Sequence, residues 1–268
     1  MKLGCSTLLY GKHGLDEALR GIREAGYQAI ELCSIPGMGY HVEPGNSAAE
    51  YRSLKKKING HGLVIESIGA SGNDPYDRSP NSKFRQLMQA AAELGAPCLT
   101  LGSGGKQDSA EDMERAIETF TMQAEYGKSV GVKISIKPHV GGVVYHTPSA
   151  HIFMQHVDRK WIGLNVDASH LWRAPVPEKG EESISKLAEY LFTARIRDTL
   201  SHERPIGPVE TQVPGGGAMN MKAIMDAFKK VSGLEIVTLE IVGTADWTLE
   251  RIQDVVERSY KALEPLAK

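Results

Sequence analysis

The residues best suited to chemistry in this sequence are charged side chains at the ends of short apolar runs. The four are Lys137, Asp167, Arg195 and Glu240, and their runs are 133–137, 162–166, 194–198 and 236–241. A carboxylate at the end of a buried strand loses hydration and is costly to hold there without a partner. Two acids and two bases in such positions predict either a shared functional site or a network of ion pairs.

The apolar runs alternate with amphipathic helical patterns throughout the sequence. The predicted strands are 3–7, 29–32, 63–68, 98–101, 133–137, 162–166, 194–198 and 236–241. Strict strand–helix alternation predicts a parallel sheet, and eight units favour a closed barrel. We therefore expect an α/β protein with a single (β/α)8 TIM barrel domain over residues 1–268. An open doubly wound sheet is the second choice, because no GxGxxG fingerprint follows the first run.

A barrel of this kind carries its active site where the strands end, so the four charged residues should converge at one mouth. His139 and His170 follow two of the same strands and are candidate proton carriers or substrate contacts. Glu66 is expected at the same rim. Trp172 is a candidate apolar wall for a sugar ring, although packing explains it equally well. The long segment 199–217, rich in glycine and proline, predicts a functional loop.

Composition narrows the classes of function. The chain has 268 residues and a formal net charge of −2, whereas a nucleic-acid surface needs a basic face. The three cysteines are widely spaced and form no CxxC pattern, which indicates a reducing compartment. No apolar run reaches the length of a membrane span, and the sequence begins directly with a strand pattern. We expect a cytoplasmic protein without nucleic-acid or membrane partners, and the sequence leaves its oligomeric state open.

The sequence resembles, over essentially its full length, the xylose isomerase-like TIM barrels. These include sugar epimerases, hydroxypyruvate isomerase, inosose dehydratase and endonuclease IV. The segment 167–170 matches the D-x-x-H of the family, and 195–198 matches its H-x-x-D segment. Pro214-Gly215-Gly216-Gly217 resembles its P-G-x-G turn, and Leu239-Glu240 matches the acid that ends the last strand. Lys137-Pro138-His139 stands where the family has Glu-Pro-His.

The resemblance implies a divalent metal, such as Mn, Mg, Co or Zn, held by Glu, Asp, His and Glu from the last four strands. Here Lys137 replaces the first Glu and Arg195 replaces the His, so only Asp167 and Glu240 remain as metal ligands. An ammonium and a guanidinium cannot ligate a cation and repel one. The two cations could instead neutralise the acids, polarise a substrate carbonyl, or bind a substrate carboxylate or phosphate. His139 or His170 would be the replacement ligands if a metal binds.

The resemblance further implies an enzyme that acts on a small sugar, keto-sugar or sugar acid by proton transfer next to a carbonyl. Isomerisation, epimerisation, dehydration and decarboxylation fit the fold equally, so the substrate and reaction stay open. We expect Lys137, Glu240, Asp167 and His170 to be catalytic, and His139, Arg195, Glu66 and Trp172 to bind substrate. The alternatives are a non-catalytic carbohydrate-binding barrel and, less in keeping with the charge, a DNA-repair endonuclease.

Overall fold

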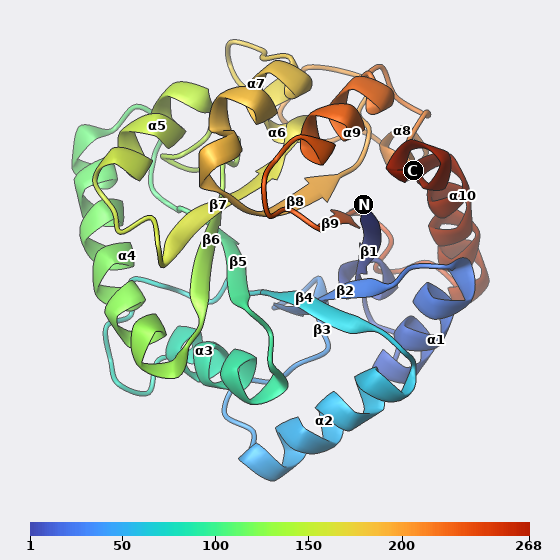
Figure 1. Cartoon of the computed structure of the whole chain (residues 1–268), viewed down its shortest axis with the longest axis horizontal. Helices are drawn as coiled ribbons and strands as arrows, with labels where there is room; N and C mark the ends of the chain where they lie inside the picture. The colour runs from blue at the N-terminus through green and yellow to red at the C-terminus, as the bar shows by residue number, and fades with distance from the viewer.

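The computed structural model describes residues 1–268, and its centre is a closed barrel of eight parallel strands (Figure 1). The strands are β1 (Lys2–Ser6), β2 (Ala29–Ile35), β4 (Val64–Gly69), β5 (Cys98–Gly102), β6 (Lys133–Lys137), β7 (Ile162–Asp167), β8 (Leu191–Ile196) and β9 (Ile236–Leu239). They pair in the order β1-β9-β8-β7-β6-β5-β4-β2, and β1 pairs with β2 to close the ring. The predicted single (β/α)8 barrel is confirmed. A two-residue strand, β3 (Gly39–Tyr40), adds antiparallel to β2.

Helices cover the outside of the barrel (Figure 1). They are α1 (Leu15–Ala25), α2 (Ala48–Gly60), α3 (Lys83–Leu94), α4 (Ala110–Val130), α5 (Thr147–Gln155), α6 (Ala168–Trp172), α7 (Gly180–Leu187), α8 (Val209–Gln212), α9 (Met221–Lys229) and α10 (Leu249–Ala267), with 3₁₀ turns η1 (Thr7–Tyr10) and η2 (Ala188–Tyr190). Hydroxyl caps begin several of them, for example Ser109 on α4 and Thr248 on α10. Gly26 and Gly95 end α1 and α3 in the left-handed conformation.

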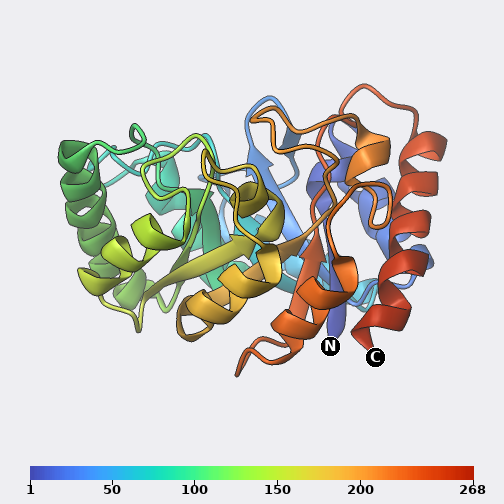
Figure 2. The same cartoon turned by 90° about the horizontal axis from the view of Figure 1, so that it is seen from above.

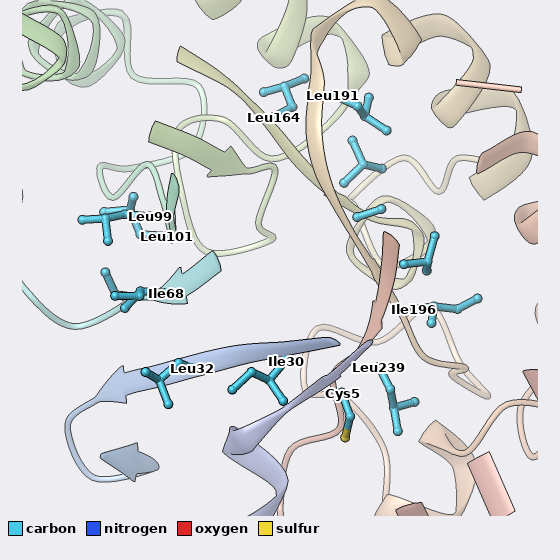
Figure 3. Close-up of a cluster of buried hydrophobic side chains, with 14 of the residues drawn as sticks. Cys5, Ile30, Leu32, Ile68, Leu99, Leu101, Leu164, Leu191, Ile196 and Leu239 are labelled. Atoms are coloured by element: carbon cyan, nitrogen blue, oxygen red, sulfur yellow. The ribbon is translucent and has the colours of Figure 1, made fainter. Parts of the chain in front are cut away.

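The apolar core lies between the barrel wall and the helices. Strand residues such as Ile30, Leu32 and Ile196 are fully buried in it (Figure 3). Because side chains alternate along a strand, the neighbours Glu31 and Arg195 point into the barrel. The interior is therefore polar where most barrels of this kind carry branched aliphatic residues.

The predicted strand 194–198 is displaced from the observed one. β8 begins at Leu191, so Leu191 belongs to a strand rather than to the preceding helix, and β8 ends at Ile196. The neighbouring strand β7 leaves space for a side chain of β8. A Cβ atom at Gly163 on β7 would lie 2.5 Å from the ring of Phe192, so only glycine admits the ring here. Arg197 consequently stands just beyond the strand, at the mouth.

The long loop that follows β8 is fastened to the end of that strand by Asp198. The buried carboxylate accepts hydrogen bonds from the backbone N–H groups of Thr199, Gly215 and Met219, at 2.8, 3.0 and 3.1 Å. Gly217 completes the turn, because a Cβ there would lie 2.3 Å from Asp198 Oδ1. The two sequence segments 195–198 and 214–217 are thus one structural unit.

The chain ends and the strand-following loops lie on opposite sides of the barrel. Figure 2 shows both termini together on the lower face, where the N-terminal amine donates to the carbonyl of Ala267 at 3.0 Å. None of the helices combines the length and apolar character needed to cross a bilayer. Cys5, Cys33 and Cys98 are free and buried. Burial raises the pKa of Cys33 well above its ordinary value, so that thiol stays protonated.

Candidate active site

The mouth of the barrel is centred on a contact between Lys137 and Glu240. Lys137 ends β6 and Glu240 directly follows β9. The Lys137 ammonium donates to both carboxylate oxygens of Glu240 at 2.6 Å. Each side chain keeps 11% of its surface exposed, so the pair is reachable from the mouth. Burial would raise the pKa of Glu240, but Lys137 and then Arg197 outweigh it, and the pKa falls below its ordinary value.

Arg195 lies beneath this pair and has no exposed surface. Its guanidinium donates to Glu31 Oε1 at 2.5 Å, to Glu66 Oε1 at 3.2 Å and to Ser67 Oγ at 2.8 Å. Its Nε lies 3.5 Å from Glu240 Oε2. Burial would lower the pKa of Arg195, but the three carboxylates raise it, so the guanidinium is a permanent cation. Arg195 therefore joins the mouth to the barrel interior rather than facing solvent.

Glu31 and Glu66 are both buried, and both accept hydrogen bonds from the guanidinium of Arg195. Glu31 also accepts from Ser6 and Thr100, at 2.7 and 2.6 Å, and Glu66 accepts from Ser67 at 2.7 Å. Burial raises the pKa of Glu66, and Arg195 offsets only part of that rise. Glu66 comes from the first half of β4 and lies in the interior, not at the rim where we expected it. The predicted substrate contacts of Glu66 and Arg195 gain no support from these positions.

Asp167 pairs with Arg197, which the sequence predictions did not single out. Asp167 Oδ1 accepts from the backbone and hydroxyl of Ser169, at 3.0 and 2.7 Å. Its Oδ2 lies 3.0 Å from Arg197 Nη2 but accepts no well-aligned hydrogen bond. Burial would raise the pKa of Asp167, yet Arg197 and Lys137 hold it below its ordinary value. Both mouth carboxylates are therefore ionised at neutral pH.

The rings of His139 and His170 lie against each other with their planes tilted by 39° and their centroids 4.1 Å apart. Burial, together with neighbouring cations, lowers the pKa of His139 to about 4 and that of His170 well below its ordinary value. Both rings are neutral at physiological pH. Nδ1 of His139 accepts from the backbone N–H of Gly141 at 3.1 Å. Its proton therefore sits on Nε2, and the ring offers a donor.

A cleft of about 440 Å³ opens beside His139, between the loops that follow β4, β5 and β6. Its other lining residues include Ser71, Asn73, Asp74, Tyr76 and Gly104. The volume suits a small ligand, since such sites hold roughly 300–1,000 Å³. Trp172 lies elsewhere, at the end of α6, where its ring stacks on His202 at 4.3 Å. The ring face that stacks on His202 supports the loop after β8. The predicted contact of Trp172 with a sugar ring stays a prediction.

The side chains at the mouth do not fit a divalent metal ion. Lys137 places an ammonium on both oxygens of Glu240, and Arg197 lies against Asp167. The structure contains no group of three or more His, Cys, Asp or Glu side chains arranged to hold a metal. His170 is not free to replace a lost ligand, because two guanidinium groups face its ring. Chemistry at this mouth has to be derived from the side chains themselves.

Two arginines of the mouth, Arg197 and Arg173, were not among the site residues predicted from the sequence. Arg197 carries a visible signal, since it stands two residues after Arg195 and alternation places both on the same side of the strand. Arg173 carries none, because the short helix α6 that presents it has too few residues for a periodic pattern. His41 lies near the rim, where it bonds Thr7 and the carbonyl of His13.

Comparisons with known proteins place this geometry in context. The family model of the xylose isomerase-like TIM barrel matches residues 19–261. Comparison with curated proteins finds no match. A D-psicose 3-epimerase solved in the presence of D-fructose superposes with a TM-score of 0.77 at 13% identity, covering 100% of this chain and 99% of the other.

Two further solved structures share the fold. The IOLI protein with a bound zinc atom gives a TM-score of 0.77 at 18% identity, over 100% of this chain and 98% of the other. A probable 3-DHS dehydratase, AsbF of Bacillus anthracis, gives 0.76 at 17% identity, over 98% and 99%. At these identities the likeness establishes the fold alone.

Proposed function

Because the chain belongs to the xylose isomerase-like TIM barrel family, we propose that it is an enzyme that moves a proton next to the carbonyl of a small sugar, keto-sugar or sugar acid. The observation that carries the proposal is the Lys137–Glu240 contact at the reachable mouth. An ionised carboxylate and an ammonium side by side are a proton acceptor and an oxyanion stabiliser in one place.

The substrate carbonyl oxygen takes hydrogen bonds from Lys137 Nζ and His139 Nε2. This frees one oxygen of Glu240 from its contact with Lys137. Glu240 then removes the proton from the carbon next to the carbonyl, and the electron pair of that C–H bond moves onto the carbonyl oxygen. The positive charge of Lys137 stabilises the resulting enolate.

The fate of the enolate decides the product. Delivery of a solvent proton to the same carbon from the opposite face, while Glu240 releases its proton to solvent, gives an epimer. Return of the Glu240 proton to the former carbonyl carbon, with a proton shift between the two enediol oxygens, gives an isomer. Loss of a β-hydroxyl as water gives a dehydration product. Asp167 is ionised at rest and is the second group able to relay a proton from solvent, because its Oδ2 has no hydrogen-bond partner. Ser169 and Arg197 hold Asp167 in place.

Proton exchange tests the proposal without knowledge of the natural product. We expect the wild-type protein to exchange the C3 proton of D-fructose or D-tagatose for deuterium in D₂O, measured by NMR. Lys137→Met should slow the exchange ~10²–10³-fold, and Glu240→Gln should abolish it. Lys222→Met removes a lysine from an exposed pair with Asp226 and is the matched control. Exchange that persists in both site variants contradicts the proposed roles.

The second candidate is a carbohydrate-binding barrel without catalysis. The observation in its favour is that Lys137 and Arg197 already have carboxylate partners and that Arg195 has three. Such a barrel would bind keto-sugars but exchange none of their protons. The NMR experiment separates the two functions, because exchange in the wild-type protein excludes a purely binding role.

A further inference from the structure

We call the part of the site formed by Lys137, Arg173, Arg197, Asp167 and Glu240 the upper mouth. Its cations outnumber its carboxylates. Lys137, Arg173 and Arg197 face only Asp167 and Glu240 as acids. The remaining acids, Glu31 and Glu66, bond Arg195 and hydroxyl groups beneath and contact none of the three upper cations. The upper mouth thus carries a local surplus of one positive charge, and the group of Arg195, Glu31 and Glu66 beneath it carries a net charge of −1.

Arg173 is the cation without an acid. Its side chain is 3% exposed, yet it donates only to the backbone carbonyls of Ser169 and Arg204 and contacts His170 Nδ1 at 3.2 Å. Removing a guanidinium from water without a counter-ion is unfavourable. Burial and then the neighbouring Arg197 lower the pKa of Arg173 to about 10, which still leaves it charged at neutral pH.

His170 cannot satisfy both of the guanidinium groups that face it. Arg197 Nη2 lies 2.8 Å from its Nε2, and Arg173 Nη2 lies 3.2 Å from its Nδ1. A neutral imidazole has one nitrogen that accepts and one that donates. One of the two arginines therefore presents an N–H group to a ring N–H, and that donor lacks an acceptor.

We infer that the upper mouth is built for a substrate that carries one carboxylate group, so that the natural substrate is a sugar acid with a carbonyl rather than a neutral sugar. The inference rests on the proposed function, since it names the substrate class of the same site. The carboxylate supplies the missing negative charge and the missing acceptor. Its route passes His139, which lines the cleft and whose ring lies 4.1 Å from that of His170.

The energetics favour a carboxylate over a hydroxyl at this position. Arginine donors pair with carboxylates through charge-assisted hydrogen bonds, often two in parallel. One such bond strengthens binding by roughly 10- to 100-fold over a neutral contact. Because the arginines are buried, added salt should weaken this preference less than it weakens a surface ion pair.

Calorimetric titration of the wild-type protein with two matched probes tests the inference. 2-Keto-D-gluconate and D-fructose differ only at C1, which is a carboxylate in the first and a hydroxymethyl group in the second. We expect the acid to bind about 10- to 100-fold more tightly. Equal affinity, tighter binding of D-fructose, or binding of neither probe would overturn the inference.

Single-residue variants test which arginines cause the tighter binding of the acid. Arg173→Gln and Arg197→Gln should each reduce the ratio of the two affinities, acid over D-fructose, by about 10-fold or more. Arg258→Gln removes a guanidinium from exposed pairs on α10 and is the control. A preference that survives in both variants contradicts the assignment. Tighter binding of the acid without any proton exchange would refute the proposed catalysis but not this inference. Proton exchange without tighter binding of the acid would refute this inference but not the proposed catalysis.

Discussion

Lys137 Nζ contacts both carboxylate oxygens of Glu240 at the same distance, 2.6 Å, across 103 residues of sequence. A single ammonium thus occupies the position where a cation would bind this carboxylate. If the lysine side chain supplies this charge, the mouth can stabilise an enolate without the zinc atom that the IOLI protein binds. The contact makes Lys137 the first residue to test.

Lys137→Met keeps the length of the side chain and removes its charge. We expect the rate of proton exchange to fall ~10²–10³-fold, the usual loss when one oxyanion-stabilising group is removed. The variant also leaves Glu240 unpaired, which should destabilise the fold. Lys137→Met with Glu240→Gln should restore stability in urea unfolding but not exchange. Unchanged exchange in the single variant would remove the lysine from the mechanism.

Rebuilding the ligand set tests the argument about metals. Lys137→Glu alone should not gain metal, because Arg195 and Arg197 still repel a cation. Lys137→Glu with Arg195→His restores the family's four ligand types and should bind Mn²⁺ or Zn²⁺, measured by calorimetry on protein treated with chelator. Wild-type protein purified without chelator should contain no stoichiometric divalent ion. About one tightly held ion per wild-type chain would show that the repulsion argument is wrong.

Arg195 is expected to matter for folding more than for substrate contact. Arg195→Met leaves Glu31 and Glu66 buried without their shared cation, a change that typically costs ~3–5 kcal/mol. Adding Glu66→Gln should recover part of the loss, because one uncompensated carboxylate is removed. The measurement is the free energy of unfolding in urea. A loss no larger than that of Arg258→Gln would contradict the buried-cluster role.

The stability of the fold should decline as the pH falls below 6.5, partly because of His170. Its folded pKa lies well below its ordinary value of 6.5, so the unfolded chain binds a proton in that window and the folded chain does not. Stability therefore rises with pH there, by at most about 1.4 kcal/mol per pH unit for one proton. Urea unfolding between pH 5 and 6 should show a shallower slope in His170→Gln. The same slope in both proteins would contradict the lowered pKa.

Asp198→Ala should release the loop after β8. The carboxylate accepts three backbone N–H bonds, and hydrogen bonds to charged groups are worth about 1.5–3 kcal/mol each. Amide hydrogen exchange at Gly215 and Met219 should therefore accelerate about 10-fold or more. Asp226→Ala, an exposed acid on α9, is the control. Unchanged protection at both amides would show that other contacts hold the loop.

The barrel could be predicted from sequence because its strands and helices alternate without interruption, and because strand ends converge in any closed parallel barrel. The four charged residues were found for the same reason. Their partners were not, because pairing depends on barrel closure. Lys137 meets Glu240 from three strands away in chain order, whereas Arg195, only one strand away, turns inward to Glu31 and Glu66. No local pattern encodes that choice.

The position of Leu191 shows a second limit. Its periodicity continues the helical pattern of Ile184 and Leu187, yet it begins β8. The deciding contact is the ring of Phe192 over Gly163, a residue on another strand. Tertiary packing overrides local propensity at such a boundary.

The three backbone hydrogen bonds to Asp198 also mark out a loop segment that can be redesigned. One carboxylate fixes the chain at Thr199 and again at Gly215 and Met219, so the segment between is held at both ends independently of its own sequence. Within it, His202 stacks on Trp172 and the carbonyl of Arg204 accepts from Arg173. Libraries that randomise residues 200–207 would therefore vary the wall beside the basic cluster while the barrel stays intact, which makes this loop the natural target for changing which substrates the protein accepts.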